Sequence, residues 1–273
     1  RADAKSHAKA PNRASLRLLA RRIHRQRRSP GRGMTVRMTA RSVVLSVLLG
    51  AHPAWATVAE LLRLTSDFGI RESTLRVALT RMVHAGDLVR SDDGYRLSDR
   101  LLARQRRQDG ALHPVTRDWD GTWTTVIVTA VGADARTRGA VRIALQDNRF
   151  GELREGVWMR PDTLDPLLPA LIRGRVRVLH AADDNPAELA RRLWDLRGWS
   201  KTGHRLLREM TAVNDVPDQF AVAAAMVRHL LADPVLPAGL LPADWPGDRL
   251  RSAYAEFADL LASRRDDQLL EAR

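Results

Sequence analysis

Six side chains on one face of a predicted helix have the types that read DNA bases. Between residues 71 and 85 the inward face of this helix is apolar and consists of Leu75, Leu79, Met82 and Val83. At roughly 100° per residue, the opposite face is small or hydrogen-bonding and carries Ser73, Thr74, Val77, Thr80, Arg81 and His84. Ser, Thr and Arg meet base edges in the major groove, and Val contacts a thymine methyl group. This face is therefore predicted to read DNA.

The preceding residues predict the element that holds this helix in place. Thr57 and Glu60 have the spacing of a capping box, which starts a helix because each side chain satisfies a free backbone amide. Gly69 can take the positive φ that ends the helix, and Ile70 then returns to the core. A helix, a tight turn and a second helix at residues 71–85 predict a helix-turn-helix.

A hairpin is predicted directly after the second helix. Residues 88–97 read as two short strands joined by a type I′ turn, with Asp93 and Gly94 in left-handed conformations. Arg90 and Arg96 flank the tip, where they are expected to contact phosphates and so fix the register on DNA. Arg71, at the start of the second helix, completes the predicted DNA-binding set. This order is typical of a winged helix-turn-helix, although such domains also mediate protein contacts.

Two further helices are predicted around this unit. Residues 39–52 form a first helix with Thr39 as its cap and an inward face of Val43, Val44, Val47 and Leu48. Arg41 lies near its start, where contact with a DNA phosphate and simple solvation are equally supported. Residues 99–109 predict an Arg-rich linker helix that ends near Gly110.

The net charge of +13 is unevenly distributed over the 273 residues. Residues 1–33 hold nine Arg and two Lys against one Asp, and residues 34–109 hold twelve Arg against eight acids. The remainder holds 22 basic and 23 acidic side chains. We expect the basic leader to be disordered. Two explanations for it stay open: an arm that follows phosphates, and an over-extended start site ahead of Met34 or Met38.

Composition excludes several classes of protein. The sequence has no run of about 18 apolar residues, so no transmembrane helix is expected. No continuous apolar core follows the basic leader, which disfavours a secretory signal. The absence of Cys excludes disulfides and thiolate metal sites and agrees with a reducing compartment. We expect a cytoplasmic protein, bound to the nucleoid through DNA, without a cofactor and without a membrane partner.

The rest of the chain predicts one small sheet domain followed by helices. Strands are expected at 123–129, 156–160 and 176–179, and helices between them at 137–148 and 164–172. Their alternation favours an α+β sandwich of the split βαβ kind. Four further helices are expected at 186–199, 201–211, 218–232 and 248–264. The fold class is thus α+β and mostly helical, with parts at 1–33 (leader), 34–109 (winged domain and linker), 110–185 (central domain), 186–265 (helical domain) and 266–273 (tail).

Motifs for catalysis are weak. The sequence contains no phosphate-binding glycine loop and no His-Glu-x-x-His helix. Asp183 and Asp184 could hold a metal ion, but two acids ahead of Asn185-Pro186 are more typical of a turn and a helix cap. The chain is therefore predicted not to be an enzyme. Six tryptophans outside the winged region either stack on a ligand or pack in the core, and packing is expected for most: Trp119, Trp123, Trp158, Trp194, Trp199 and Trp245.

Four separated segments resemble the PaaX family of bacterial repressors. They are Ala40-Arg41-Ser42, Trp119 to Trp123, Gly156 to Pro161, and Asp233 to Pro237 running into Leu241 to Gly247. The resemblance runs in order from about residue 38 to 265. It implies an N-terminal winged helix, a central domain similar to the ferredoxin-like fold of Cas2 proteins, and a helical C-terminal domain involved in dimerisation.

The same resemblance implies a function. Members of the family repress catabolic genes, notably those for phenylacetate, and an aryl-coenzyme A thioester such as phenylacetyl-coenzyme A releases them from DNA. Carried over, the DNA role falls on the helix at 71–85 and on the wing. The family offers no effector motif that can be placed on numbered positions. Side chains of suitable type for the phosphates and the aryl group are Arg142, Trp158, Arg160 and Lys201.

The sequence thus predicts a ligand-responsive repressor. Its expected partners are a double-stranded DNA operator, a coenzyme A thioester effector and a second copy of the chain. A symmetric dimer would place two recognition helices in successive major grooves, with half-sites about 34 Å apart or a multiple of that distance. Two alternatives remain: a DNA-binding scaffold without a small ligand, and a metal-dependent nuclease like the Cas2 proteins.

Overall fold

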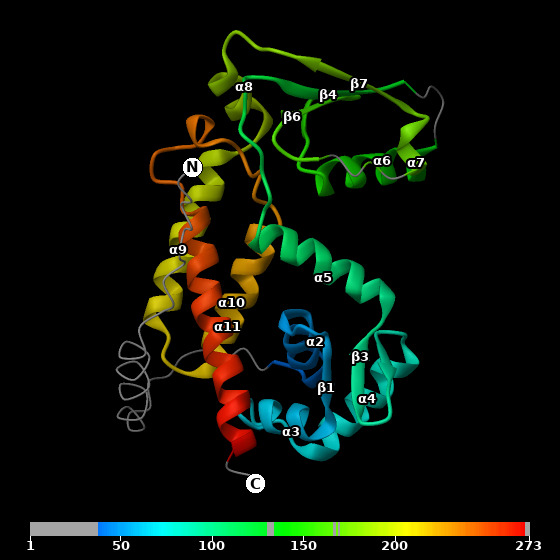
Figure 1. Cartoon of the computed structure of the whole chain (residues 1–273), viewed down its shortest axis with the longest axis vertical. Helices are drawn as coiled ribbons and strands as arrows, with labels where there is room; N and C mark the ends of the chain where they lie inside the picture. The colour runs from blue at the N-terminus through cyan, green and yellow to red at the C-terminus, as the bar shows by residue number, and fades with distance from the viewer. Residues whose placement is uncertain (1–37, 130–133, 166–167, 169, 271–273) are drawn as a thin grey trace, which may run out of the picture. The chain divides into compact units, whose positions relative to one another are not determined.

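The computed structural model describes residues 38–129, 134–165, 168 and 170–270 (Figure 1). The predicted leader at residues 1–33 lies outside this description. The described chain is mixed α+β with two antiparallel sheets and is mostly helical. Within these residues no helix is both long enough and apolar enough to cross a bilayer.

The first module packs three helices against a small sheet. Its helices are α2 (Ala40–Gly50), α3 (Val58–Ser66) and α4 (Glu72–His84). Thr39 caps α2, and the predicted capping box starts α3: the Thr57 hydroxyl accepts from the Glu60 amide at 3.1 Å, and Glu60 accepts from the Thr57 amide at 2.7 Å. Gly69 has the predicted positive φ of 65° after α3. These local signals therefore set the helix boundaries.

The sheet of this module contains a strand that the sequence reading missed. Its strands are β1 (Trp55–Thr57), β2 (Leu88–Arg90) and β3 (Gly94–Leu97), in the order β1-β3-β2. The predicted type I′ turn is wrong, because neither Asp93 nor Gly94 has a positive φ. Gly94 instead pairs with Thr57, and a Cβ placed on it would collide with the Ala56 carbonyl oxygen. Glycine is needed there because two strands approach closely.

The expected linker helix is a packed part of the fold. Helix α5 (Asp99–Leu112) runs past Gly110, beyond the predicted end. Leu101 belongs to the core of the first module, whereas Ala111 and Leu112 belong to the core of the C-terminal helices. The buried Gln105 amide donates to three carbonyls at the end of α2, those of Leu48, Leu49 and Ala51, at 2.8–3.3 Å. This helix therefore joins two cores.

The central module has the predicted split βαβ topology. Its strands are β4 (Trp123–Val128), β5 (Gly151–Arg154), β6 (Val157–Pro161) and β7 (Val176–Ala181), all antiparallel and in the order β5-β6-β4-β7. Helices α6 (Ala135–Asp147) and α7 (Ala170–Arg173) lie on one side of the sheet (Figure 1). The sequence reading missed β5, and α7 is shorter than the helix expected at 164–172.

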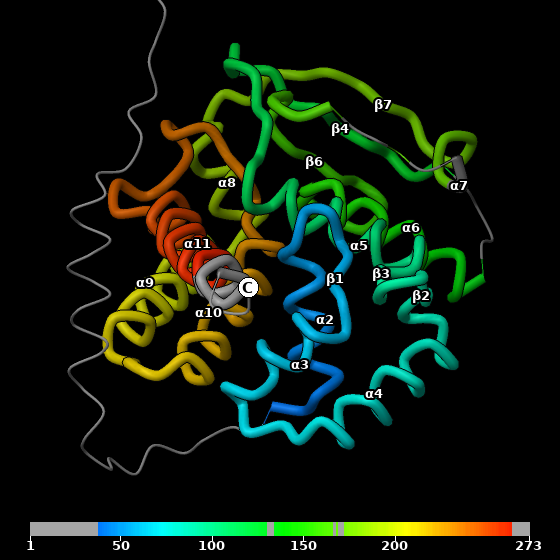
Figure 2. The backbone as a smooth tube through the Cα atoms, turned by 60° about the horizontal axis from the view of Figure 1, so that its bottom comes forward, coloured from blue at the N-terminus to red at the C-terminus, as the bar shows by residue number. Residues whose placement is uncertain are grey.

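The C-terminal module consists of helices, as predicted, with different boundaries. They are α8 (Pro186–Leu193), α9 (Leu196–Ala212), α10 (Val216–Leu230), the 3-10 helix η1 (Ala238–Leu240) and α11 (Gly247–Leu270). The helix expected at 186–199 is divided at Trp194. Asp195 begins the new helix α9 as its cap, because its side chain accepts from the Gly198 amide at 2.9 Å. Helix α11 continues to Leu270, past the expected end at Arg264. Helices α9, α10 and α11 lie side by side (Figure 2).

The tryptophans outside the first module pack mainly against one another. Trp123 is fully buried, with ring centroids of Trp119 and Trp194 at 6.0 and 6.5 Å. Trp199 stacks on Trp245 at 4.1 Å. Aromatic pairs at such distances stabilise a core beyond the area they bury. These contacts favour the packing interpretation over a ligand-stacking role.

Candidate DNA-binding surface

Helix α4 exposes the face predicted to read DNA. Leu75, Leu79 and Met82 are at most 1% exposed and fix the orientation of the helix against the core. All six predicted base-reading side chains are exposed: Ser73, Thr74, Val77, Thr80, Arg81 and His84. Val83 was expected to face inward but is 36% exposed. The valine at position 77 is 51% exposed, which leaves an apolar group available for contact on an otherwise polar face.

The polar groups of α4 differ in how far they are engaged. Arg76 forms an ion pair with Glu72 one turn earlier at 2.6 Å, and the Thr80 hydroxyl donates to the Arg76 carbonyl at 3.1 Å. Among the described residues, Arg71 and Arg81 make no ion pair or side-chain hydrogen bond. Their guanidinium groups therefore keep all their donors for an external partner.

A groove between α2 and α4 brings half of the predicted residues together. It is lined by the start of α2 at Thr39, Ala40 and Arg41, and by α4 residues that include Ser73, Thr74, Val77 and Arg81. The free amides at a helix start favour negative charge. The groove thus combines a phosphate-binding feature with side chains suited to base edges.

Arg41 is held in place by a buried carboxylate. Asp87, in the turn after α4, has only 3% of its side chain exposed. It accepts from Arg41 at 2.8 Å and from Arg100, in the first turn of α5, at 2.5 Å. The two arginine side chains remain 60% and 67% exposed. Arg41 is therefore paired with a carboxylate but still largely exposed. Arg100 is in the same situation and is a second candidate for phosphate contact, which the sequence did not indicate.

The two arginines of the hairpin are on opposite faces. Arg96 pairs with Val89 across the hairpin, and Arg90 pairs with Tyr95. Cross-strand partners share a face and successive residues alternate, so Arg90 and Arg96 point to different sides. Both are exposed. The two arginines lie on the two strands of the hairpin, but their side chains are on opposite faces.

The four candidates for effector contact are not brought to one site. Trp158 is buried, and the Arg142 guanidinium lies 5.5 Å from its ring centroid while pairing with Glu152 at 2.6 Å. Arg160 is 2% exposed, lies over the Phe150 ring, and donates to the Leu164 carbonyl; burial lowers its pKa to about 10. Lys201 is exposed on α9, and no described contact joins it to the other three.

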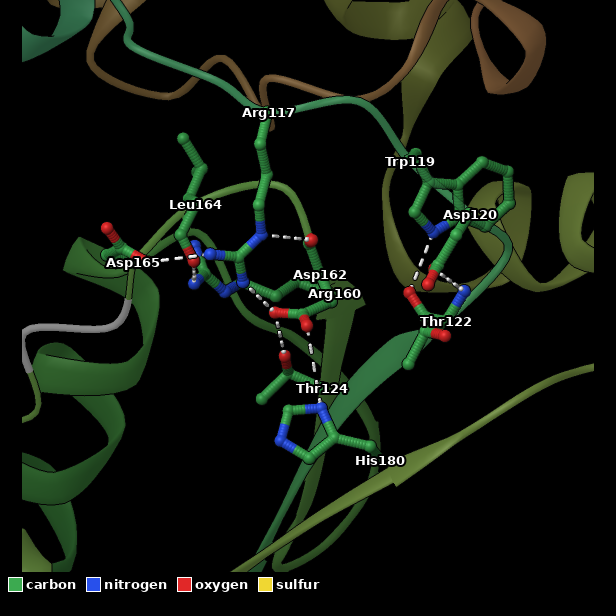
Figure 3. Close-up of polar contacts among 10 residues, drawn as sticks. All are labelled: Arg117, Trp119, Asp120, Thr122, Thr124, Arg160, Asp162, Leu164, Asp165 and His180. Atoms are coloured by element: carbon green, nitrogen blue, oxygen red, sulfur yellow. Dashed lines mark hydrogen bonds and ion pairs between the residues drawn. The ribbon is translucent and has the colours of Figure 1, made fainter.

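Polar groups at the end of β6 form a closed network (Figure 3). The Asp162 carboxylate accepts from Arg117 at 2.7 Å and from Thr124 at 2.9 Å, and His180 lies 3.6 Å away. Burial opposes ionisation, but the hydrogen bonds from Thr124 and Arg117 outweigh it and hold the pKa of Asp162 below its ordinary value. The bond with Asp162 in turn raises the pKa of Arg117. This network joins the loop before β4 to the sheet.

One of the two acids considered for a metal site has a structural role. Asp183 accepts from the Asn185 amide at 2.8 Å, and Asn185 caps α8. In the part of the chain that the structure describes, no three acidic or histidine side chains are grouped as a metal ion would require. The contact of Asp183 therefore agrees with the turn-and-cap interpretation.

Family models match three consecutive parts of the chain. A PaaX-like protein model matches residues 39–101, a PaaX protein central Cas2-like domain matches 116–182, and a PaaX-like protein C-terminal domain matches 194–270. The chain belongs to the PaaX-like family. This is a family of regulators, and the three matches follow the three modules of the fold.

A solved structure that shares both sequence and fold with this PaaX-like protein comes from a mycobacterium. It is the uncharacterized protein Rv0674 from Mycobacterium tuberculosis, with 68% identity and a TM-score of 0.76. The match covers 84% of this chain and 98% of that one. No curated protein matches the chain.

Proposed function

We propose that this PaaX-like regulator is a DNA-binding transcriptional repressor whose first module acts as a winged helix-turn-helix. The observation that carries the proposal is the groove in which the start of α2 and the exposed face of α4 combine Arg41, Ser73, Thr74, Val77 and Arg81. Helix α3 and helix α4 form the helix-turn-helix, and the β2–β3 hairpin is the wing.

The side chains divide into two roles on DNA. Those of α4 meet base edges in the major groove, where Arg81 and the hydroxyls supply hydrogen bonds and Val77 supplies an apolar contact. Arg41 and Arg100, held by Asp87, contact phosphates and fix the register. Because the hairpin arginines face opposite sides, only one of Arg90 and Arg96 contacts the phosphate strand nearest the wing.

The regulatory part of the proposal follows the family resemblance. The repressor acts as a dimer whose two α4 helices enter successive major grooves about 34 Å apart. It controls a catabolic operon of the phenylacetate type, and an aryl-coenzyme A thioester releases it. By linkage, such an effector must bind the DNA-free form more tightly than the DNA-bound form.

A selection experiment tests the DNA-binding role. Duplexes bound by the full chain are selected from a random pool, and fluorescence anisotropy then compares the enriched sequence with a scrambled duplex. A specific repressor prefers its site by at least about a thousandfold. Equal affinities for the two duplexes would contradict sequence-specific binding. If phenylacetyl-coenzyme A leaves the affinity unchanged, the release mechanism is wrong and the scaffold alternative gains support.

A further inference from the structure

A cavity lies between the DNA-binding helices and the C-terminal helices. Its volume is about 290 Å³. The walls come from α2, α5, α10 and α11, and most of the lining is apolar, as with Val47, Leu49, Phe220, Val227, Phe257 and Leu261. An apolar cavity of this size accommodates a phenyl ring or a short acyl chain rather than a large cofactor.

The charges on the lining have one sign. Arg104 of α5 and Arg228 of α10 both line the cavity, which has no acidic lining residue among those described. Both arginines are exposed, and in the described part of the chain neither has an ion pair or hydrogen bond. The third basic group, His52, already contacts Asp109 at 3.2 Å. Two guanidinium groups beside an apolar wall suit an anion attached to an apolar group.

Two polar side chains also line the cavity. They are Tyr254 of α11 and Gln108 of α5. A phenol is protonated at neutral pH and can donate, and burial raises the pKa of Tyr254 further. A carbonyl oxygen near the apolar group of a ligand would be a suitable acceptor for it.

We propose that this cavity is the effector site and binds a compact aryl or acyl group whose anionic end is held by Arg104 and Arg228. This inference rests on the proposed function, because it places the effector on a regulator of DNA binding. The anion is either the carboxylate of a free acid or the phosphates of a coenzyme A thioester, whose apolar group alone enters the cavity.

The position of the cavity explains how a ligand there acts on DNA binding. Its α2 wall packs against α4, and α2 also carries Arg41, which is paired with Asp87 beside α4. A ligand that changes the spacing between α2 and α10 therefore shifts the groove that meets DNA. The ligand and the DNA then weaken each other's binding by the same factor.

Calorimetry on the full chain tests the site with defined probes. The probes are phenylacetate, hexanoate, their coenzyme A thioesters and coenzyme A alone. Replacing both arginines (Arg104→Gln with Arg228→Gln) weakens binding by at least about tenfold, because charge-assisted hydrogen bonds are lost. Arg106→Gln is the matched control, since Arg106 is exposed on the same helix but does not line the cavity. It leaves binding unchanged.

A second variant tests the apolar part independently of charge. Ala224→Leu fills space at the cavity wall while both arginines remain, and it abolishes binding. Melting curves and DNA affinity without ligand stay unchanged for a folded variant. Tight binding of the free acids identifies a carboxylate as the anion, whereas binding of the thioesters alone identifies the coenzyme A phosphates.

The outcomes separate this inference from the proposed function. If a probe binds the natural chain and the cavity variants equally well, the site is elsewhere, although ligand-responsive repression stands. If no probe binds the natural chain while it still selects DNA, the cavity inference is overturned. If a probe binds through the cavity but the chain does not distinguish DNA sequences, the proposed function fails and the ligand site remains.

Discussion

Four arginines of the first module and three of the central module differ in whether an internal partner engages their charge. On α4 and the hairpin, the described contacts leave Arg71, Arg81, Arg90 and Arg96 without an internal partner. In the central sheet, Arg117 and Arg142 pair with carboxylates, and Arg160 is buried over an aromatic ring. The comparison teaches that arginines of equal charge differ in what they can bind, because only those without an internal partner keep all their donors for another molecule.

The largest effect is expected for an engaged charge in the C-terminal module. Asp233 is 1% exposed and accepts from Arg251 at 2.6 Å. Asp233→Ala leaves the largely buried Arg251 without this partner, and we expect the free energy of unfolding in urea to fall by about 3–5 kcal/mol.

A matched carboxylate controls for the loss of charge itself. Asp248 contacts the same Arg251 at 3.3 Å, but its side chain is fully exposed. Asp248→Ala should therefore leave stability unchanged, because exposed ion pairs are screened by solvent. Similar losses in the two variants would show that burial does not decide the value of these pairs.

A free charge on α4 should show the opposite behaviour. Arg81→Ala should lower affinity for the selected DNA sequence roughly 5- to 150-fold, with a smaller loss on scrambled DNA, because a base contact is removed. Its stability should change little. Arg76→Ala is the control, since Arg76 is on the same helix but is paired with Glu72. Anisotropy titrations in which Arg81→Ala weakens both DNAs equally would contradict a base-reading role.

Sequence reasoning succeeded where the cause was local. The capping box at Thr57, the glycine after α3 and the apolar spacing on α4 all act within a few residues, so a single sequence displays them. The same spacing assigned Val83 to the wrong face, because a residue at the edge of an apolar stripe is buried only if a neighbouring element covers it.

Features that depend on distant partners could not be predicted in this way. Asp87 gave no signal, because its two arginines lie 13 and 46 residues away along the chain. Strand β5, with the sequence Gly-Glu-Leu-Arg, lacks β-branched residues and forms through its pairing with β6. The sequence at Gly94 suggested a turn. In the structure Gly94 lies on β3 where β1 approaches so closely that a Cβ would not fit. The cavity between α2 and α10 likewise arises only from tertiary packing.

Acid stability should report the Asp162 network of the central sheet. The pKa of Asp162 is lower in the folded chain than the ordinary 3.8. The ionised carboxylate therefore stabilises the fold above pH 3.8, and this stabilisation is lost as the pH falls through the pKa of the folded chain. Asp162→Asn should therefore reduce stability at pH 7 by about 1 kcal/mol and flatten the further loss below pH ~4.

The other carboxylate on Arg117 provides the control for this titration. Asp165 contacts Arg117 at 2.8 Å, but 89% of its side chain is exposed. Asp165→Asn should retain the acid-dependent loss seen in the natural chain. Urea melts at several pH values measure both variants, and an unchanged slope for Asp162→Asn would assign the acid sensitivity to other groups.

Deleting residues 1–33 should have the smallest effect on sequence recognition. These residues carry nine Arg and two Lys, whereas the predicted base-reading side chains are on α4. If the leader follows phosphates, its removal lowers the salt dependence of binding by about 0.9 in slope for each phosphate that is no longer neutralised, while preference for the selected DNA is unchanged. A variant with the nine arginines replaced by Gln separates charge from length. If either variant loses its preference for the selected DNA, basic residues outside α4 also take part in sequence recognition. The comparison between the first module and the central sheet would then have to include the leader.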